Sequence, residues 1–84
     1  MADITLYALS TCVHCKHAKE YLEEHNQEYD CIYVDRLSGE ERNETIRTVK
    51  KFNPNLSFPT VVIGDDVIVG FKKEAIDQAL EGQS

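Results

Sequence analysis

The chain has 84 residues, 42% of them hydrophobic and 29% charged, which is the balance of a globular domain rather than of a disordered segment. Its formal net charge of −6 argues against nucleic acid as a partner, because a phosphate backbone attracts basic surface. The apolar runs are too short to span a membrane, and the N-terminus lacks the charged and apolar leader of an exported protein. We therefore expect a single cytoplasmic domain over residues 1–84, with residues 83–84 as a flexible tail.

The first half of the chain has the pattern of a strand, a helix and a second strand. Residues 3–9 are almost continuously apolar, which predicts a strand covered on both faces. After a turn at Ser10 and Thr11, residues 12–25 carry apolar side chains at helical spacing. Residues 29–35 then alternate as a second strand. Such a β-α-β unit predicts parallel strands joined by a right-handed crossover.

A second helix is predicted from its start signal. Ser38 followed three residues later by Glu41 has the pattern of a capping box, and the helix it opens runs to about Phe52. We expect this helix to bury Ile46, Val49 and Phe52. The Asn-Pro-Asn sequence that follows ends it, because proline cannot continue a helix.

The C-terminal third predicts a hairpin and a last helix. Residues 60–63 and 67–69 are short β-prone runs, and the Gly-Asp-Asp between them has turn chemistry. Residues 72–81 then have helical spacing, with Gly82 as the stop. The side chains expected on the buried face of this helix are Ala75, Ile76, Ala79 and Leu80. The element order is β-α-β-α-β-β-α.

Two of the three cysteines lie three positions apart at the first strand-to-helix turn. At this spacing in a helix, Cys12 and Cys15 lie about 5–6 Å apart at Cβ, close enough for a disulfide. Unpaired N–H groups at a helix N-terminus favour an anion, so the thiolate of Cys12 is stabilised there. The thiolate is the form that attacks disulfides, which makes Cys12 the predicted nucleophile and Cys15 the resolving thiol.

The histidines near this turn leave two alternatives open. His14, protonated beside the thiolate, would stabilise the reduced form and tune the redox potential, or it is an exposed histidine of little effect. Cys12, Cys15 and the nearby His14 and His17 would also suit a metal-binding carrier, which is the alternative function. These side chains fan over a wide arc on one helical turn, so we predict no metal site. Cys31 is expected to be a small buried hydrophobic residue.

The Cys-x-x-Cys turn, the element order and Pro59 before the hairpin together resemble the glutaredoxin branch of the thioredoxin superfamily, over essentially the whole chain. The resemblance implies a thioredoxin fold of glutaredoxin type. This α/β fold has a four-stranded mixed sheet with three strands in one direction, one antiparallel strand and helices on both faces. It also implies a cis Phe58–Pro59 peptide facing Cys12. The residues predicted to contact substrate are Thr11, Val13, Phe58, Pro59, Gly70, Phe71 and Lys72.

The activity implied is that of a dithiol–disulfide oxidoreductase in electron transfer and cell redox homeostasis, with no bound cofactor. Its partners would be disulfide-bearing proteins or glutathione mixed disulfides, and the protein would be a monomer. Lys72 and Lys73 lie where the helix dipole disfavours positive charge. They are either a solvated helix end or a basic contact for an acidic partner or a substrate carboxylate.

Two departures from the glutaredoxin pattern leave the electron donor open. Glutaredoxins commonly bind a glutathione carboxylate through a lysine three residues before the first cysteine, where this chain has Leu9. They also have a Gly-Gly pair followed by acidic or hydroxyl residues that hold the γ-glutamyl end of glutathione, where this chain has Gly70-Phe71-Lys72-Lys73. The Cys-Val-x-Cys and Gly-Phe-basic turns are similar to the NrdH-type redoxins, which take electrons from thioredoxin reductase and pass them to ribonucleotide reductase. Their Trp-Ser pair is replaced here by Ile68-Val69. Glutathione as co-substrate and thioredoxin reductase both remain candidates.

Overall fold

The computed structural model describes residues 4–82, so Asp3 and the predicted tail at residues 83–84 lie outside the described residues. The elements follow the predicted order. The strands are β1 (Ile4–Ala8), β2 (Asp30–Tyr33), β3 (Thr60–Ile63) and β4 (Asp66–Val69). The helices are α1 (Val13–Glu24), α2 (Gly39–Phe52) and α3 (Lys73–Gly82), with a short 3₁₀ helix, η1 (Val34–Arg36), after β2.

The four strands form one mixed sheet in the order β2-β1-β3-β4. β1 pairs in parallel with β2, β3 is antiparallel to β1, and β4 is antiparallel to β3. Three strands therefore share one direction and β3 opposes them, as predicted. The central strand β1 has Leu6 opposite Cys31 on one side and opposite Val61 on the other.

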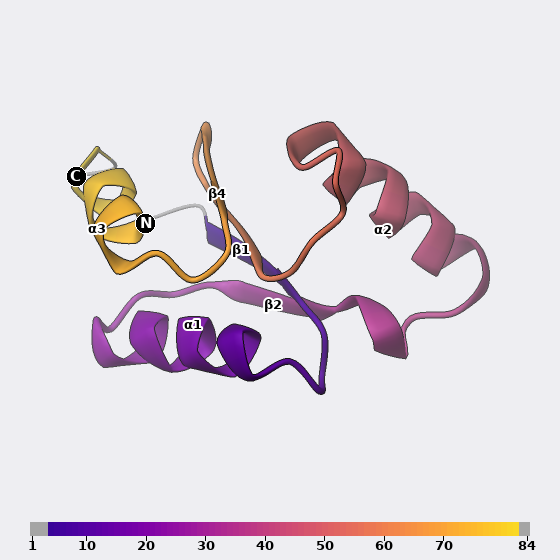
Figure 1. The fold of residues 1–84 in the computed structure, drawn as a ribbon, viewed down its shortest axis with the longest axis horizontal. Coiled ribbons are helices and arrows are strands. Elements are labelled where there is room, and N and C mark those ends of the chain that lie inside the picture. Colours follow the sequence, from indigo (N-terminus) through magenta and orange to yellow (C-terminus); the bar gives the residue numbers. More distant parts are fainter. Residues whose placement is uncertain (1–3, 83–84) are drawn as a thin grey trace.

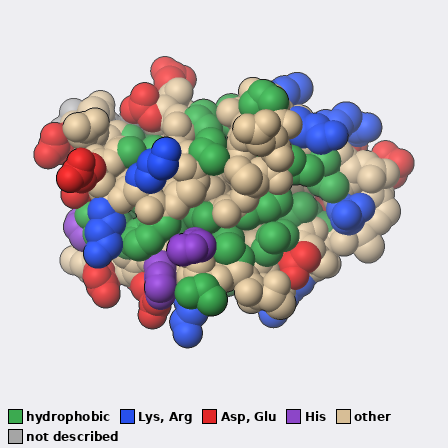
Figure 2. All heavy atoms as spheres, viewed as in Figure 1, with side chains coloured by type: hydrophobic (Ala, Val, Ile, Leu, Met, Phe, Trp, Pro, Cys, Tyr) green, Lys and Arg blue, Asp and Glu red, His purple; other side chains and the backbone are tan. Residues whose placement is uncertain are grey.

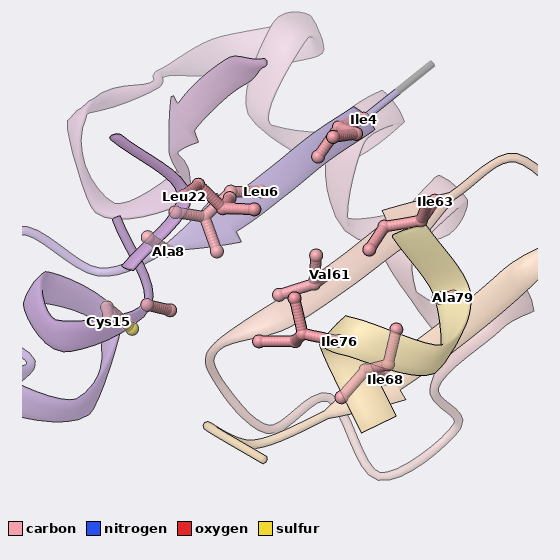
Figure 3. Close-up of a cluster of buried hydrophobic side chains, with 11 residues drawn as sticks. Ile4, Leu6, Ala8, Cys15, Leu22, Val61, Ile63, Ile68, Ile76 and Ala79 are labelled. Atoms are coloured by element: carbon pink, nitrogen blue, oxygen red, sulfur yellow. The ribbon is translucent and has the colours of Figure 1, made fainter. Parts of the chain in front are cut away.

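Helices cover both faces of the sheet, with α1 and α3 on one face and α2 on the other (Figure 1). Side chains of β1 alternate between the faces because successive strand residues point to opposite sides. Leu6 joins the larger core cluster with Leu22 and Ile76, whereas Tyr7 packs with Val49 on the α2 face. Figure 3 shows the larger cluster, in which residues of α1, α3 and three strands converge. The thioredoxin fold and the doubly covered first strand are confirmed.

Three local predictions are wrong in detail. The second strand ends at Tyr33, because buried Val34 starts the η1 turn and packs on the α2 face. Ser38 is the N-cap of α2 but makes no side-chain cap hydrogen bond. Gly39 directly after it adopts a φ of +60°, which turns the backbone away from capping-box geometry. Phe52, which was predicted to be buried, is 40% exposed. Among the described residues, Val49 is the one fully buried side chain that α2 contributes.

Two smaller differences concern Ile46, which is half-buried, and the last helix. That helix begins one residue later than predicted and includes Gly82. Its predicted buried face is confirmed at Ile76 and Ala79, with the other two positions half-buried.

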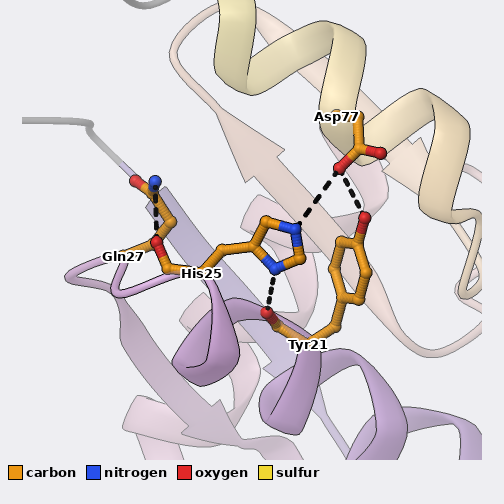
Figure 4. A network of polar contacts seen from close by, with 4 residues as sticks. All are labelled: Tyr21, His25, Gln27 and Asp77. Atoms are coloured by element: carbon orange, nitrogen blue, oxygen red, sulfur yellow. Dashed lines mark hydrogen bonds and ion pairs between the residues drawn. The ribbon is translucent and has the colours of Figure 1, made fainter.

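A polar network joins α1 to α3 outside the apolar core (Figure 4). The Tyr21 hydroxyl donates to Asp77 Oδ1 over 2.5 Å, which raises the pKa of Tyr21 to about 12 because the carboxylate disfavours a phenolate beside it. His25 Nδ1 lies 2.9 Å from the Tyr21 carbonyl oxygen, and its Nε2 lies 4.0 Å from Asp77. Polar as well as apolar contacts therefore join α1 to α3.

Candidate active site

Cys12 lies where the chain leaves β1 and enters α1. It is the N-cap residue, in extended conformation, and its Sγ accepts a hydrogen bond from the backbone N–H of Cys15 over 3.3 Å. A side chain that accepts from the first turn satisfies a helical N–H that has no partner within the helix. The sulfur therefore sits in a site that favours negative charge, and the residue remains partly accessible.

Cys15 has the opposite environment. It is 2% exposed and belongs to the core cluster under α1 and α3. Burial raises the pKa of the Cys15 thiol to about 12, with further contributions from its hydrogen bond to Cys12 and from the negative charge there. The two thiols of the turn are both free in the structure and differ sharply in their accessibility.

Ser10 anchors the turn before Cys12 to the segment that follows β2. Its backbone N–H donates to Asp35 Oδ1 over 2.9 Å, and its hydroxyl donates to Asp35 Oδ2. These bonds, first the hydroxyl and then the amide, lower the pKa of the Asp35 carboxyl below its ordinary value. The ends of β1 and β2 are therefore held together at the side of the dithiol.

This contact predicts a pH-dependent stability. A carboxyl whose pKa is lower in the folded state stabilises the fold above its unfolded pKa, about 3.9, and loses that effect as the pH falls through the folded pKa. Ser10→Ala is expected to lower the urea midpoint at pH 7, with a smaller difference from the wild type at pH 3. In an Asp35→Asn background the same substitution should show no such pH dependence. If Ser10→Ala lowers the urea midpoint by the same amount at pH 7 and at pH 3, the hydrogen bonds from Ser10 to Asp35 are not the source of the pH dependence.

The Phe58–Pro59 peptide is cis, as the resemblance implied. Pro59 is buried, and its carbonyl oxygen accepts from the Gly70 N–H over 2.8 Å. Gly70 has a φ of +87°, a conformation that glycine adopts without strain. Phe58 packs against both core clusters, and the larger one also contacts Cys12 and Phe71. The predicted substrate positions 58, 59, 70 and 71 thus gather around the core that holds the dithiol.

Buried Asn53 stabilises the segment that carries Pro59 through side-chain hydrogen bonds. Its Nδ2 lies 3.1 Å from the Ser57 carbonyl oxygen and 3.2 Å from Thr60 Oγ1, and it is 3% exposed. The Thr60 hydroxyl in turn donates to the same Ser57 carbonyl over 2.8 Å. The network spans the segment that carries Pro59.

We expect Asn53→Ala to destabilise the protein by about 1–3 kcal/mol, because the buried hydroxyl oxygen of Thr60 loses its donor. The free energy of unfolding in urea measures the effect. Asn55→Ala, an exposed change in the same loop, is the matched control and should stay within about 0.5 kcal/mol of the wild type. Equal losses in both variants would show that the network does not hold the loop.

The other predicted site residues are exposed at the surface. Thr11, His14 and Lys72 are exposed, and Val13 is 64% exposed. The His14 side chain has no hydrogen-bond or ion-pair partner among residues 4–82. Lys73 Nζ instead lies over the rings of Tyr21 and Phe71, 5.7 and 5.8 Å from their centroids.

The metal-carrier alternative gains no support from the geometry. Among residues 4–82, no three His, Cys, Asp or Glu side chains gather as a metal site, so Cys12, His14, Cys15 and His17 do not form one. Cys31 lies on β2, half-buried against the larger core cluster rather than fully buried.

Sequence reasoning missed the groups that flank Cys12 on one side. A pocket of about 230 Å³ is lined by Leu9, Ser10, Cys12, Lys16, Lys19 and Tyr33. Neither lysine was among the predicted site residues. Their spacing of four and seven residues from Cys12, which places all three on one helix face, is the signal that could have found them.

The surface has no single charge character. On the face shown in Figure 2, basic side chains gather over α2, and acidic and basic side chains mix over the rest.

None of the helices within residues 4–82 has the length and apolarity needed to cross a membrane.

Comparisons with known proteins agree with this fold. The glutaredoxin family model matches residues 4–68. A glutaredoxin-like 8.6 kDa protein in the rubredoxin operon of Clostridium pasteurianum is 33% identical over 78 residues, covering 93% of this chain and 97% of that protein. A glutaredoxin of Archaeoglobus fulgidus is 36% identical with a TM-score of 0.90, covering 98% of this chain and 89% of that one. The NrdH-redoxin of Escherichia coli is 26% identical with a TM-score of 0.75, covering 90% and 92%.

Proposed function

Because the chain belongs to the glutaredoxin family, we propose that it is a dithiol–disulfide oxidoreductase acting through Cys12 and Cys15. The observation that carries this proposal is the unequal setting of the two thiols. Cys12 is accessible and its sulfur accepts a helical N–H, whereas Cys15 is buried with a raised pKa. The Cys12 thiol is therefore suited to be the attacking nucleophile, and the Cys15 thiol is suited to be the resolving thiol.

In the first step the Cys12 thiolate attacks one sulfur of a substrate disulfide. A new S–S bond forms to Cys12, the substrate S–S bond breaks, and the other half leaves as a thiolate that takes up a proton. In the second step Cys15 loses its proton and attacks the Cys12 sulfur, releasing the second substrate thiol. Two electrons have then passed to the substrate, and the protein holds a Cys12–Cys15 disulfide.

The environment of Cys15 couples these steps. Two of the influences that raise its pKa, the hydrogen bond to Cys12 and the charge on Cys12, come from the partner thiol itself. Both are lost once Cys12 is bonded to substrate, so Cys15 becomes easier to deprotonate when its attack is needed. Burial, the largest cause of the raised pKa of Cys15, does not depend on Cys12, so formation of the mixed disulfide lowers this pKa only in part.

The electron donor would be glutathione or thioredoxin reductase, and the protein would work in a reducing compartment such as the cytoplasm. Leu9 and the exposed Lys72 stand at two positions where glutaredoxins bind glutathione, which favours the second donor. The E. coli NrdH-redoxin, described as having a thioredoxin-like activity profile, is a precedent within the same fold.

The test is NADPH consumption with a disulfide acceptor in two regenerating systems, one with glutathione and glutathione reductase, the other with thioredoxin reductase. Turnover in either system supports the oxidoreductase, and the system that works identifies the donor class. Absence of turnover in both, with Cys12 and Cys15 fully reduced beforehand, would contradict the proposal.

A further inference from the structure

The pocket beside Cys12 lies between the first turns of α1 and the carboxyl ends of β1 and β2. Leu9 and Ser10 follow β1, Tyr33 is the last residue of β2, and α1 supplies the two lysines. Its volume of about 230 Å³ is below the 300–1,000 Å³ typical of drug-sized ligand sites. The pocket has room for a short side chain or a small acid rather than for a large cofactor.

Helix geometry aligns the two lysines with the reactive sulfur. The backbone N–H of Lys16 donates to the Cys12 carbonyl oxygen over 3.1 Å, so Lys16 lies one turn beyond Cys12 on the same face. Lys19 follows three residues later on that face. It is half-buried, and a lysine in this setting keeps its stem against apolar surface and its ammonium in water.

The pocket is lined by basic side chains, although the chain as a whole is acidic. The chain has 15 acidic and 9 basic residues, yet no carboxylate is among the residues that line this pocket. The nearby carboxylate of Asp35 accepts two hydrogen bonds from Ser10. A second pocket, along the same helix, contains Glu20 and Glu24 together with Lys73. The side of α1 that carries Cys12 is thus the side suited to an anion.

We propose that this pocket selects disulfides that carry a carboxylate near the sulfur, with Lys16 and Lys19 as the specificity-determining residues. The inference rests on the proposed function, since it concerns the substrate half that becomes bonded to Cys12. That half occupies the pocket with its carboxylate toward the lysines, and the other half departs as a thiolate. The carboxylate comes from a small thiol acid or from an acidic residue beside the cysteine of a peptide.

The test uses the Cys15→Ser background, in which the Cys12 adduct accumulates. The probes are 3,3′-dithiodipropionate, 2-hydroxyethyl disulfide and cystamine, which carry a carboxylate, no charge and an ammonium. Quenched mass spectrometry with peptide mapping gives the rate of adduct formation at Cys12. Each rate is divided by the rate of the same disulfide with a neutral free thiol, which removes intrinsic reactivity.

We expect the normalised rate to be about tenfold higher for the carboxylate than for the neutral disulfide, and lower for the ammonium. Adding Lys16→Gln and Lys19→Gln together should bring the ratio of the carboxylate rate to the neutral rate to about one. The control is Lys50→Gln with Lys51→Gln, which removes the same charge from exposed positions on α2 and should keep the preference.

Equal normalised rates for the three disulfides would overturn the inference, as would an equal loss of preference in the α2 control. Peptide disulfides with Asp or Asn beside the cysteine then distinguish the sources. A preference for Asp over Asn would identify acidic protein segments, and its absence would restrict the site to small thiol acids. Absence of any Cys12 adduct, even with the neutral disulfide, would instead contradict the proposed function.

Discussion

Replacement of Cys12 by serine is expected to lower disulfide turnover by at least about 10³-fold while the protein stays folded. A serine hydroxyl is not deprotonated at neutral pH and does not attack a disulfide. The same hydroxyl is a good N-cap, so it can accept the Cys15 N–H that the Cys12 sulfur accepts over 3.3 Å. Loss of activity would therefore report chemistry rather than unfolding, which circular dichroism checks.

The companion variant Cys15→Ser should behave differently. Cys12 still attacks, so one substrate half accumulates on Cys12 as a mixed disulfide that mass spectrometry detects. Cys31→Ser is the matched control, because Cys31 is a partly accessible cysteine on β2, outside the turn. It should retain turnover within about twofold. If Cys12→Ser stayed active while Cys15→Ser did not, the roles of the two thiols would have to be exchanged.

The parts of the fold that local patterns determine were predictable. Thr60–Ile63 is a strand with the predicted bounds, because its β-branched run is flanked by proline and a Gly-Asp-Asp turn. The Cys12 and Cys15 pair was found for a similar reason. A spacing of three residues at a helix start is a local property, and it places both sulfurs without knowledge of the rest of the chain.

What the sequence did not reveal depends on contacts between distant segments. Ser10 and Asp35 are 25 residues apart, and their hydrogen bonds exist only because β1 and β2 lie side by side. The pocket beside Cys12 likewise needs Tyr33 of β2 next to the lysines of α1. Phe52 was misplaced for a related reason, since helical spacing identifies a face but not how far the opposing sheet extends.

Leu22→Ala is expected to have the largest effect on stability. Leu22 is fully buried and belongs to the same core cluster as Leu6 and Ile76 (Figure 3). Truncating a buried leucine costs about 2–5 kcal/mol through lost burial and the cavity left behind. An 84-residue domain has a total stability of roughly 4–13 kcal/mol, so this change removes a large part of it. The melting temperature should fall by roughly 10–25 °C.

Two controls separate cavity formation from general sensitivity to substitution. Leu22→Met conserves volume and should cost less than about 1.5 kcal/mol. Val67→Ala on the edge strand β4 removes methyl groups from a side chain that is 36% exposed, and should change stability by less than about 0.5 kcal/mol. Because Cys15 belongs to the same cluster as Leu22, the Leu22→Ala cavity should also increase the accessibility of the Cys15 thiol. Faster alkylation of Cys15 in Leu22→Ala than in Leu22→Met would show that core packing protects the resolving thiol, and equal rates would contradict it.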